Sequence, residues 1–447
     1  MTATIEVAPR ETTNAILRRI LVLATPTGFL AVLQVVAQLL ETWLAARQGT
    51  AALAGWAVVL PFSLLMQQMS AGAMGGGVVS AIARALGGNR TQEASALVLH
   101  AALIATLGGG IFALTLACFP YTILGLIAGP VAAEAAAPYA IWLFGAGAIP
   151  LWLANTLASV LRGGGRHGLA ARVLTLGYIV YPPFAWLLAE PFGMGLAGIG
   201  AAFALVFWAS ALAMIVTVLR GGAGFVPSLR IRPSGALFHR ILSVGLVACA
   251  LASVANLTTI LVTAQIAGFG PAAVAAYGIA ARLEFLMIPL AFGVGSALTA
   301  LVGRAVGAGD WETARRIAWT GGLLAFALAS AAGLAVALAP YSFASTFSDD
   351  AAVIDIATRG LAYTGFGFGG FGLGMALYFA SMGAGRMRWA VAAAFSRISI
   401  AVGGGWVFAT IGGMGLEGYF LGVALGITAY GLVTALGVRR STWPGKG

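Results

Sequence analysis

Long apolar stretches, separated by short polar clusters, run through the whole 447-residue chain. Each stretch is long enough for an α-helix to cross the hydrocarbon core of a bilayer, which takes about 20 residues. None shows the alternation over about ten residues that is typical of a membrane barrel strand. The pattern predicts an all-α polytopic membrane protein with twelve transmembrane helices, at 16–45, 51–83, 94–119, 135–161, 169–189, 194–219, 241–267, 272–303, 315–343, 352–382, 388–411 and 414–438.

The composition excludes the other broad classes of protein. Charged residues make up 8% of the chain and apolar residues 60%, whereas a soluble domain carries about 25% charged residues. The high hydrophobicity also excludes a disordered chain. The formal net charge is +11, but the arginines lie in short clusters between apolar stretches, which indicates membrane topology and no nucleic-acid partner.

The basic residues concentrate at the two termini and in alternate loops, while the loops on the opposite side hold a single basic residue, Arg47. Because cytoplasmic loops carry the excess of Lys and Arg, we expect both termini in the cytoplasm and the protein in a bacterial-type inner (plasma) membrane. The residues on the basic side are Arg10, Arg18, Arg19, Arg84, Arg90, Arg162, Arg166, Arg172, Arg220, Arg230, Arg232, Arg240, Arg304, Arg315, Arg316, Arg386, Arg388, Arg439, Arg440 and Lys446.

The two halves of the sequence repeat at a nearly constant offset of 220 residues. Because each half has an even number of spans, both halves have the same orientation and the repeat is parallel. It predicts an N-lobe at 1–219, a cytoplasmic linker at 220–240 and a C-lobe at 241–447. The matching segments are GTAALAG at 49–55 with GPAAVAA at 270–276, RALGGNRTQEA at 84–94 with RAVGAGDWETA at 304–314, GGGR at 163–166 with GAGR at 383–386, and GMGLAG at 193–198 with GMGLEG at 413–418.

Only two acidic residues, Glu41 and Glu284, lie well inside apolar stretches. Gln34 and Gln38 precede Glu41 by seven and three residues, so the three side chains share one helical face. Thr27 lies on the same face, seven residues before Gln34. A carboxylate there could take up a proton on one side of the membrane and release it on the other. Alternatively, Glu41 is a residue of the outer interface, since it lies near the far end of the first span.

Glu284 lies near the middle of the eighth span, where a lone charge is costly. Arg282 is two residues away and therefore points to another side of the helix. We expect Arg397, in the eleventh span, to be its partner. A structural ion pair between Glu284 and Arg397 and a role in ion coupling are both consistent with the sequence.

Three groups of residues are candidates for substrate contact. Methionine side chains adapt to varied ligands, and amide and hydroxyl groups bind without a fixed charge. Glutamines that bond a neighbouring helix, and glycines that allow close packing around phenylalanines, explain the same residues without a substrate. The candidates are Met66, Gln67, Gln68 and Met69 in the second span, Asn256 and Thr259 in the seventh, and Phe366 and Phe368 in the glycine-rich tenth.

The parallel six-plus-six repeat resembles the multidrug and toxic compound extrusion (MATE) transporters. So do the first-span pattern of Pro26, Glu41 and GTAALAG, and the segment LVGRAVGAGDWETA at 301–314. The resemblance covers essentially the whole chain. It implies a V-shaped pair of six-helix lobes that exports amphipathic, often cationic, organic compounds by alternating access, in exchange for H⁺ or Na⁺.

Carried over residue by residue, the resemblance is incomplete. Glu41 occupies the place of the first-span Asp to which MATE transporters are thought to couple cations. The fifth span differs, because Gly177 and Tyr181 stand before Pro182 where relatives with an N-lobe ion site have an Asn and an Asp. The alternative C-lobe site does not transfer, since the seventh span contains no acidic residue. A lone carboxylate beside two glutamines can bind a proton, whereas Na⁺ prefers several oxygen ligands, so we favour H⁺.

We therefore predict a monomeric cation-coupled antiporter that exports small organic compounds and drugs and needs no cofactor. The sequence contains no Walker motif, metal-ligand cluster or nucleophile triad, so no enzymatic activity is expected. The alternative is a lipid-linked oligosaccharide flippase of the same superfamily. That class usually carries more cationic residues in its cavity and often extra spans, whereas here only Arg282 and Arg397 are plausible cavity cations.

Overall fold

The computed structural model describes residues 12–228, 230–439 and 441–443, and within these ranges its regular secondary structure is entirely helical. Arg10, Arg440 and Lys446 of the basic-side set lie outside the described residues.

Eleven long apolar helices and one bent pair confirm the prediction of twelve crossings. The crossings are α1 (Thr13–Arg47); α2 (Thr50–Gln67) continued by η1 (Gln68–Met74) and α3 (Gly75–Gly87); α4 (Thr91–Cys118); α6 (Pro130–Ala140) with η2 (Ile141–Ala146) and α7 (Ala148–Gly163); α8 (His167–Ala189); α9 (Gly195–Leu219); α10 (Gly235–Ile266) followed by η3 (Ala267–Phe269); α11 (Pro271–Gly307); α12 (Trp311–Leu338); α14 (Ala351–Ala384); α15 (Arg388–Ile398) with η4 (Ser399–Gly404) and η5 (Val407–Ile411); and α16 (Leu416–Leu436).

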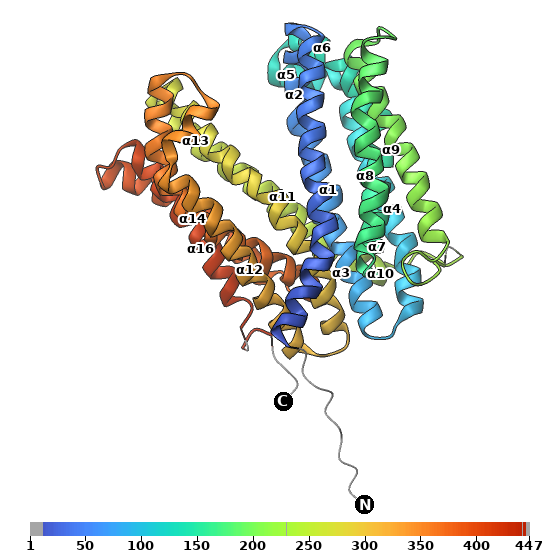
Figure 1. The fold of residues 1–447 in the computed structure, drawn as a ribbon. Coiled ribbons are helices and arrows are strands. Elements are labelled where there is room, and N and C mark those ends of the chain that lie inside the picture. Colours follow the sequence, from blue (N-terminus) through green and yellow to red (C-terminus); the bar gives the residue numbers. More distant parts are fainter. Residues whose placement is uncertain (1–11, 229, 440, 444–447) are drawn as a thin grey trace, which may run out of the picture.

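The helices form two bundles that diverge from one end of the molecule (Figure 1). The first bundle packs around an apolar core that includes Trp56 and Tyr139, and the second has its own core around Tyr277. A third apolar cluster joins the first turns of α1, at Ile16, to α11 and to Trp443 near the end of the chain. The start of α1 and the end of the described chain therefore lie together, at what we call the basic end.

Two short helices were not predicted, α5 (Pro120–Ala128) and α13 (Pro340–Phe347). Each begins with proline at its first position, where the missing N–H has no helical partner to lose. The residues before them have nearly the same backbone angles: φ −124° and ψ 43° at Phe119, φ −128° and ψ 48° at Ala339. The repeat thus extends to backbone conformation. The ninth span ends at Leu338, earlier than the predicted 343.

Three crossings contain π-helical turns, which the apolar pattern did not reveal. They are η1 in the second crossing, η2 in the fourth, and η4 with η5 in the eleventh. The fourth crossing bends by 46° between residues 130–146 and 148–163. A side chain at Gly147 would lie 2.4 Å from the carbonyl oxygen of Leu143, so glycine permits this bend. Single π-turns are frequent at functional sites.

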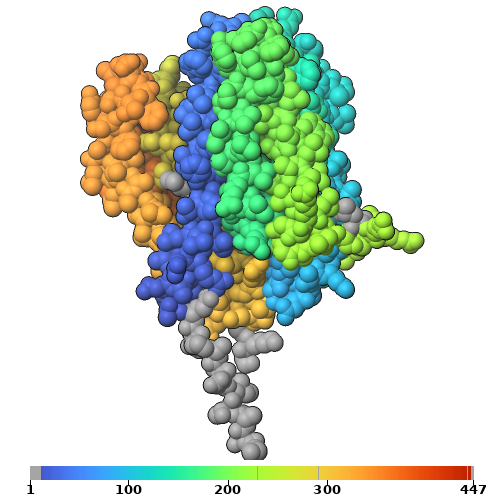
Figure 2. All heavy atoms as spheres, turned by 45° about the vertical axis from the view of Figure 1, so that its right-hand side comes forward, coloured from blue at the N-terminus to red at the C-terminus, as the bar shows by residue number. Residues whose placement is uncertain are grey.

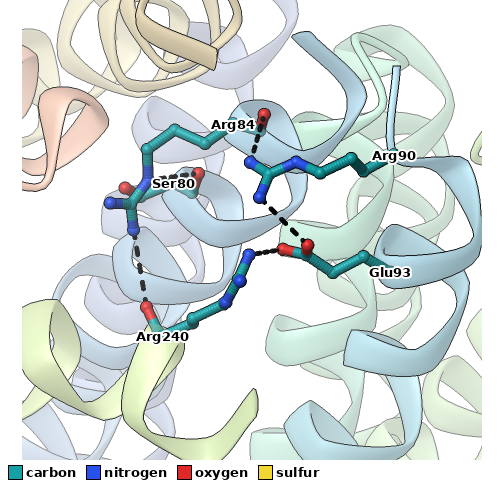
Figure 3. Close-up of polar contacts among 5 residues, drawn as sticks. All are labelled: Ser80, Arg84, Arg90, Glu93 and Arg240. Atoms are coloured by element: carbon teal, nitrogen blue, oxygen red, sulfur yellow. Dashed lines mark hydrogen bonds and ion pairs between the residues drawn. The ribbon is translucent and has the colours of Figure 1, made fainter. Parts of the chain in front are cut away.

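The two bundles are tied together at the basic end (Figure 3). Ser80 of α3 donates a hydrogen bond to the carbonyl oxygen of Met382 in α14. Arg84 donates through Nε to the Ser80 carbonyl oxygen over 3.2 Å and through Nη2 to that of Arg240 over 3.5 Å. The side chain of Arg240 in turn forms an ion pair with Glu93 of α4. These contacts connect α3, α4, α10 and α14.

Backbone approaches at repeat-related positions make the same junction tight. A Cβ atom at Gly87 would lie 2.1 Å from the carbonyl oxygen of Arg304, and one at Gly307 would lie 2.2 Å from that of Arg84. Figure 2 shows that, away from this end, the surface is hollowed between α1 (blue) and the orange helices, with part of α11 (yellow) set back between them. The molecule is closed at the basic end and opens toward the opposite end.

Candidate functional site

Glu41 is the centre of a polar cluster inside the first bundle. Its Oε1 atom accepts a hydrogen bond from Nε1 of Trp56 over 2.8 Å and a second from the hydroxyl of Tyr139. Trp56 comes from α2 and Tyr139 from α6, and both side chains are buried. Three helices therefore meet at one carboxylate, whose charge is stabilised by donors fixed in an apolar core.

Two tyrosines of α8 complete the cluster. The hydroxyl of Tyr181 is buried beside Glu41 and interacts with its carboxylate, but the two groups lie outside ordinary hydrogen-bond geometry. The hydroxyl of Tyr178 is buried in the same way beside Gln34. Gln38, which lies on α1 like Gln34, is partly buried. The polar face of α1 is thus directed at α8 rather than at lipid, and its buried hydroxyls retain unused hydrogen-bonding capacity.

The sequence did not single out Trp56, Tyr139, Tyr178 or Tyr181 as partners of Glu41. Tyr178 and Tyr181 are three residues apart and hence on one helical face, a signal that could have indicated a shared neighbour. Gly177, one of the fifth-span residues that differ from those of relatives with an N-lobe ion site, has a steric role. A Cβ atom there would lie 2.6 Å from the Ser210 hydroxyl oxygen. The absent side chain lets α8 and α9 approach.

An exposed ion pair joins the last turn of α1 to the end of α8. Nε of Arg47 lies 2.6 Å from Oε1 of Glu190, and Nη2 lies 3.1 Å from Oε2. Trp186 donates through its indole N–H to the same carboxylate over 3.0 Å. The Arg47 hydrogen bond holds the pKa of Glu190 below its usual range.

We expect Glu190→Gln to lower the melting temperature slightly at pH 7. A carboxyl whose pKa is lowered by folding stabilises the protein above its unfolded pKa and loses this contribution as the pH falls through its folded pKa. The difference between parent and variant should therefore shrink toward acid pH in thermal unfolding of the detergent-solubilised protein. Asp349→Asn, at an exposed acid of another loop, is the control. A pH-independent difference would contradict the assignment.

The second bundle contains a separate charged site. Glu284 of α11 and Arg397 of α15 form an ion pair, with side chains 11% and 12% exposed. The Arg397 guanidinium carbon lies 5.7 Å from the ring centroid of Phe371. Tyr277 interacts with both charges and with Thr259. This carboxylate is thus paired with a cation, whereas Glu41 is held by uncharged donors.

The residues predicted to contact substrate differ in their burial and in their hydrogen bonds. Met66 is fully buried in the first bundle, while Gln67, Gln68 and Met69 are partly buried where η1 begins. The two candidates of α10, Asn256 and Thr259, bond to carbonyl oxygens of their own helix, over 2.9 and 3.5 Å.

The two phenylalanines of α14 lie on different faces of the helix. Phe366 is 65% exposed, whereas Phe368 is 1% exposed in the core of the second bundle. Residues two positions apart point in nearly opposite directions on a helix, so only Phe366 has an open surface in this conformation.

Comparisons with known proteins agree with this architecture. The MatE family model matches residues 26–187 and 246–407, two segments displaced by the offset of the internal repeat. A probable multidrug resistance protein of Deinococcus radiodurans, NorM, is 29% identical over 459 residues, which cover 95% of each chain. The solved structure of a MOP superfamily transporter from Pyrococcus furiosus has a TM-score of 0.88 at 21% identity and covers 97% of this chain and 96% of its own.

A second solved structure, of the Vibrio cholerae MATE transporter VcmN in its bent form, also has a TM-score of 0.88, at 19% identity, and covers 96% of this chain and 98% of its own. These likenesses show the fold, and the family match extends over both halves of the sequence. The chain therefore belongs to the MatE family of membrane transporters and is not an enzyme.

Proposed function

We propose that the protein is a proton-coupled antiporter that exports amphipathic or cationic organic compounds by alternating access. The observation that carries this proposal is the Glu41 carboxylate, held between α1, α2 and α6 by Trp56 and Tyr139. An intramembrane carboxylate is costly to keep and marks an ion pathway by default. The name of the Deinococcus radiodurans relative supports drug-like substrates.

The donor types around Glu41 favour H⁺ over Na⁺. An indole N–H cannot ligate a cation, and a tyrosine hydroxyl that donates to the carboxylate points its hydrogen at the place a cation would occupy. Both donors satisfy the ionised carboxylate without a metal ion. Protonation of the carboxyl needs no additional ligands, so the same cluster can bind and release H⁺.

Alternating access would use the two bundles as rigid bodies. We assign residues 1–219 to the N-lobe, 220–240 to the linker and 241–447 to the C-lobe, and we expect a monomer. The space between the lobes would admit substrate, with Gln67, Gln68 and Met69 on one side and Asn256 and Phe366 on the other.

Dye uptake into everted vesicles, whose lumen corresponds to the outside of the cell, tests the proposal when a proton gradient and a sodium gradient are imposed separately. We expect uptake with the proton gradient, collapse of uptake on addition of a protonophore, and no uptake with the sodium gradient alone. Sodium-driven uptake would overturn the choice of ion. Gradient-independent movement of a lipid-linked oligosaccharide, with no dye transport, would instead favour the flippase alternative.

The arginine distribution supports a bacterial-type inner-membrane protein whose basic end faces the cytoplasm. A cysteine at Ser348, in the loop between α13 and α14, should then react with an impermeant thiol reagent applied outside intact cells. Cys118 is exposed and must first be replaced by serine. The matched control is Ser228→Cys in the linker, because Ser228 and Ser348 have similar partial exposure. If only the Ser228→Cys variant were labelled in intact cells, the orientation of the protein would be the opposite of the one proposed.

A further inference from the structure

A crevice of about 530 Å³ lies at the basic end between α1 and α11. Three arginines line it, Arg18 and Arg19 from α1 and Arg304 from α11, and none of the described residues of its wall is acidic. Arg18 is exposed and forms no hydrogen bond or ion pair with another described residue. The crevice therefore concentrates positive charge where the two bundles meet.

The apolar part of the wall lies one turn deeper in the membrane on both helices. Val22 follows Arg18 by four residues on α1, and Ala300 precedes Arg304 by four on α11, so each pair shares a helical face. Val22 is 62% exposed. The crevice thus presents cations at the membrane edge and an aliphatic surface toward the bilayer interior.

Arg304 is fixed in this position by the first bundle. Its Nη2 atom donates to the carbonyl oxygen of Gly164 over 2.7 Å, in the turn between α7 and α8. Arg19 and Arg166 both lie close enough to repel its charge. A second cavity, of about 550 Å³, shares Gly165 and Arg304 with the crevice wall and is also lined by Arg166. Such a gathering of guanidinium groups is favourable when an anion lies among them.

We propose that this crevice binds the phosphate headgroup of an anionic phospholipid, with an acyl chain along the Val22 surface. Guanidinium groups suit bidentate phosphate binding, and basic pockets between transmembrane helices at the cytoplasmic face are suited to anionic lipid headgroups. A free phosphate ion would leave the aliphatic wall unused. The bound lipid contacts α1 and the turn at Gly165 from one bundle and α11 from the other, so it stabilises the closed basic end.

Thermal unfolding of the full-length protein in a neutral detergent tests the proposal independently of transport. Phosphatidylglycerol added to the micelles should raise the melting temperature, whereas phosphatidylcholine and inorganic phosphate should not. The double variant Arg18→Gln with Arg304→Gln should lose this rise. Arg220→Gln, at an exposed arginine at the end of α9 on the same side of the membrane, should keep it.

An equal rise for phosphatidylglycerol and phosphatidylcholine, or an equal rise for the parent and the double variant, would overturn the proposal. A rise with inorganic phosphate matching that with phosphatidylglycerol would show a free-anion site instead. Should the double variant fail to fold, Arg18→Gln alone carries the test, because Arg18 has no described partner to lose. Native mass spectrometry should then show fewer bound phosphatidylglycerol molecules on that variant than on Arg220→Gln, and equal numbers would overturn the proposal.

Discussion

Glu41→Gln should abolish proton-driven dye uptake into everted vesicles, which is export in the cell, while leaving substrate binding measurable. The amide oxygen of glutamine can accept the same hydrogen bonds from Trp56 and Tyr139 that Oε1 of Glu41 accepts. The variant therefore resembles the protonated state in shape and charge but has no proton to release. Because the cluster stays bonded, the loss should appear in driven transport rather than in folding, as compared by dye uptake and dye binding.

Glu134→Gln is the matched control, because Glu134 is an exposed acid on α6, the helix that carries Tyr139. We expect it to transport at the parent rate. Glu41→Asp should retain part of the activity and shift its pH dependence, since the carboxylate is kept but withdrawn from its donors. Efflux by Glu41→Gln at the parent rate under a proton gradient would remove Glu41 from the mechanism and leave Glu284 as the next candidate.

The twelve crossings were predictable because the bilayer requires long apolar helices whatever their tertiary contacts. Helix α9 begins and ends within one residue of the predicted span. The π-turns and the short helices α5 and α13 were missed for a different reason. They depend on local backbone geometry, at Gly147 and at the residues before Pro120 and Pro340, which hydrophobicity does not register.

The charged members of the site, and the glutamines Gln34 and Gln38 on the same face as Glu41, were predictable. Burying Glu41 or Glu284 carries an energetic cost that the sequence reveals directly. Its aromatic members could not be found in the same way, because tyrosine and tryptophan are ordinary residues of an apolar helix. Tyr139 becomes a partner of Glu41 only through the packing of α6 and α2 beside α1, which no local pattern encodes.

Arg397→Ala should destabilise the protein strongly, by roughly 3–5 kcal/mol, the usual result of removing one member of a buried ion pair. The ion pair with Glu284 is almost completely shielded, with side chains 12% and 11% exposed. Without Arg397, the carboxylate stays in an apolar core that includes Tyr277 and Phe371. Thermal unfolding in detergent, together with protein abundance in the membrane, measures the loss.

The double variant Glu284→Gln with Arg397→Ala distinguishes a pair from two independent residues. Because it leaves no unpaired charge, it should recover part of the stability lost by Arg397→Ala, and the coupling should be about 0.5–3 kcal/mol. Arg282→Ala is the control, since Arg282 lies on the same helix as Glu284 but is exposed, and it should cost much less. Strictly additive effects of the two changes would mean that Glu284 and Arg397 do not stabilise each other.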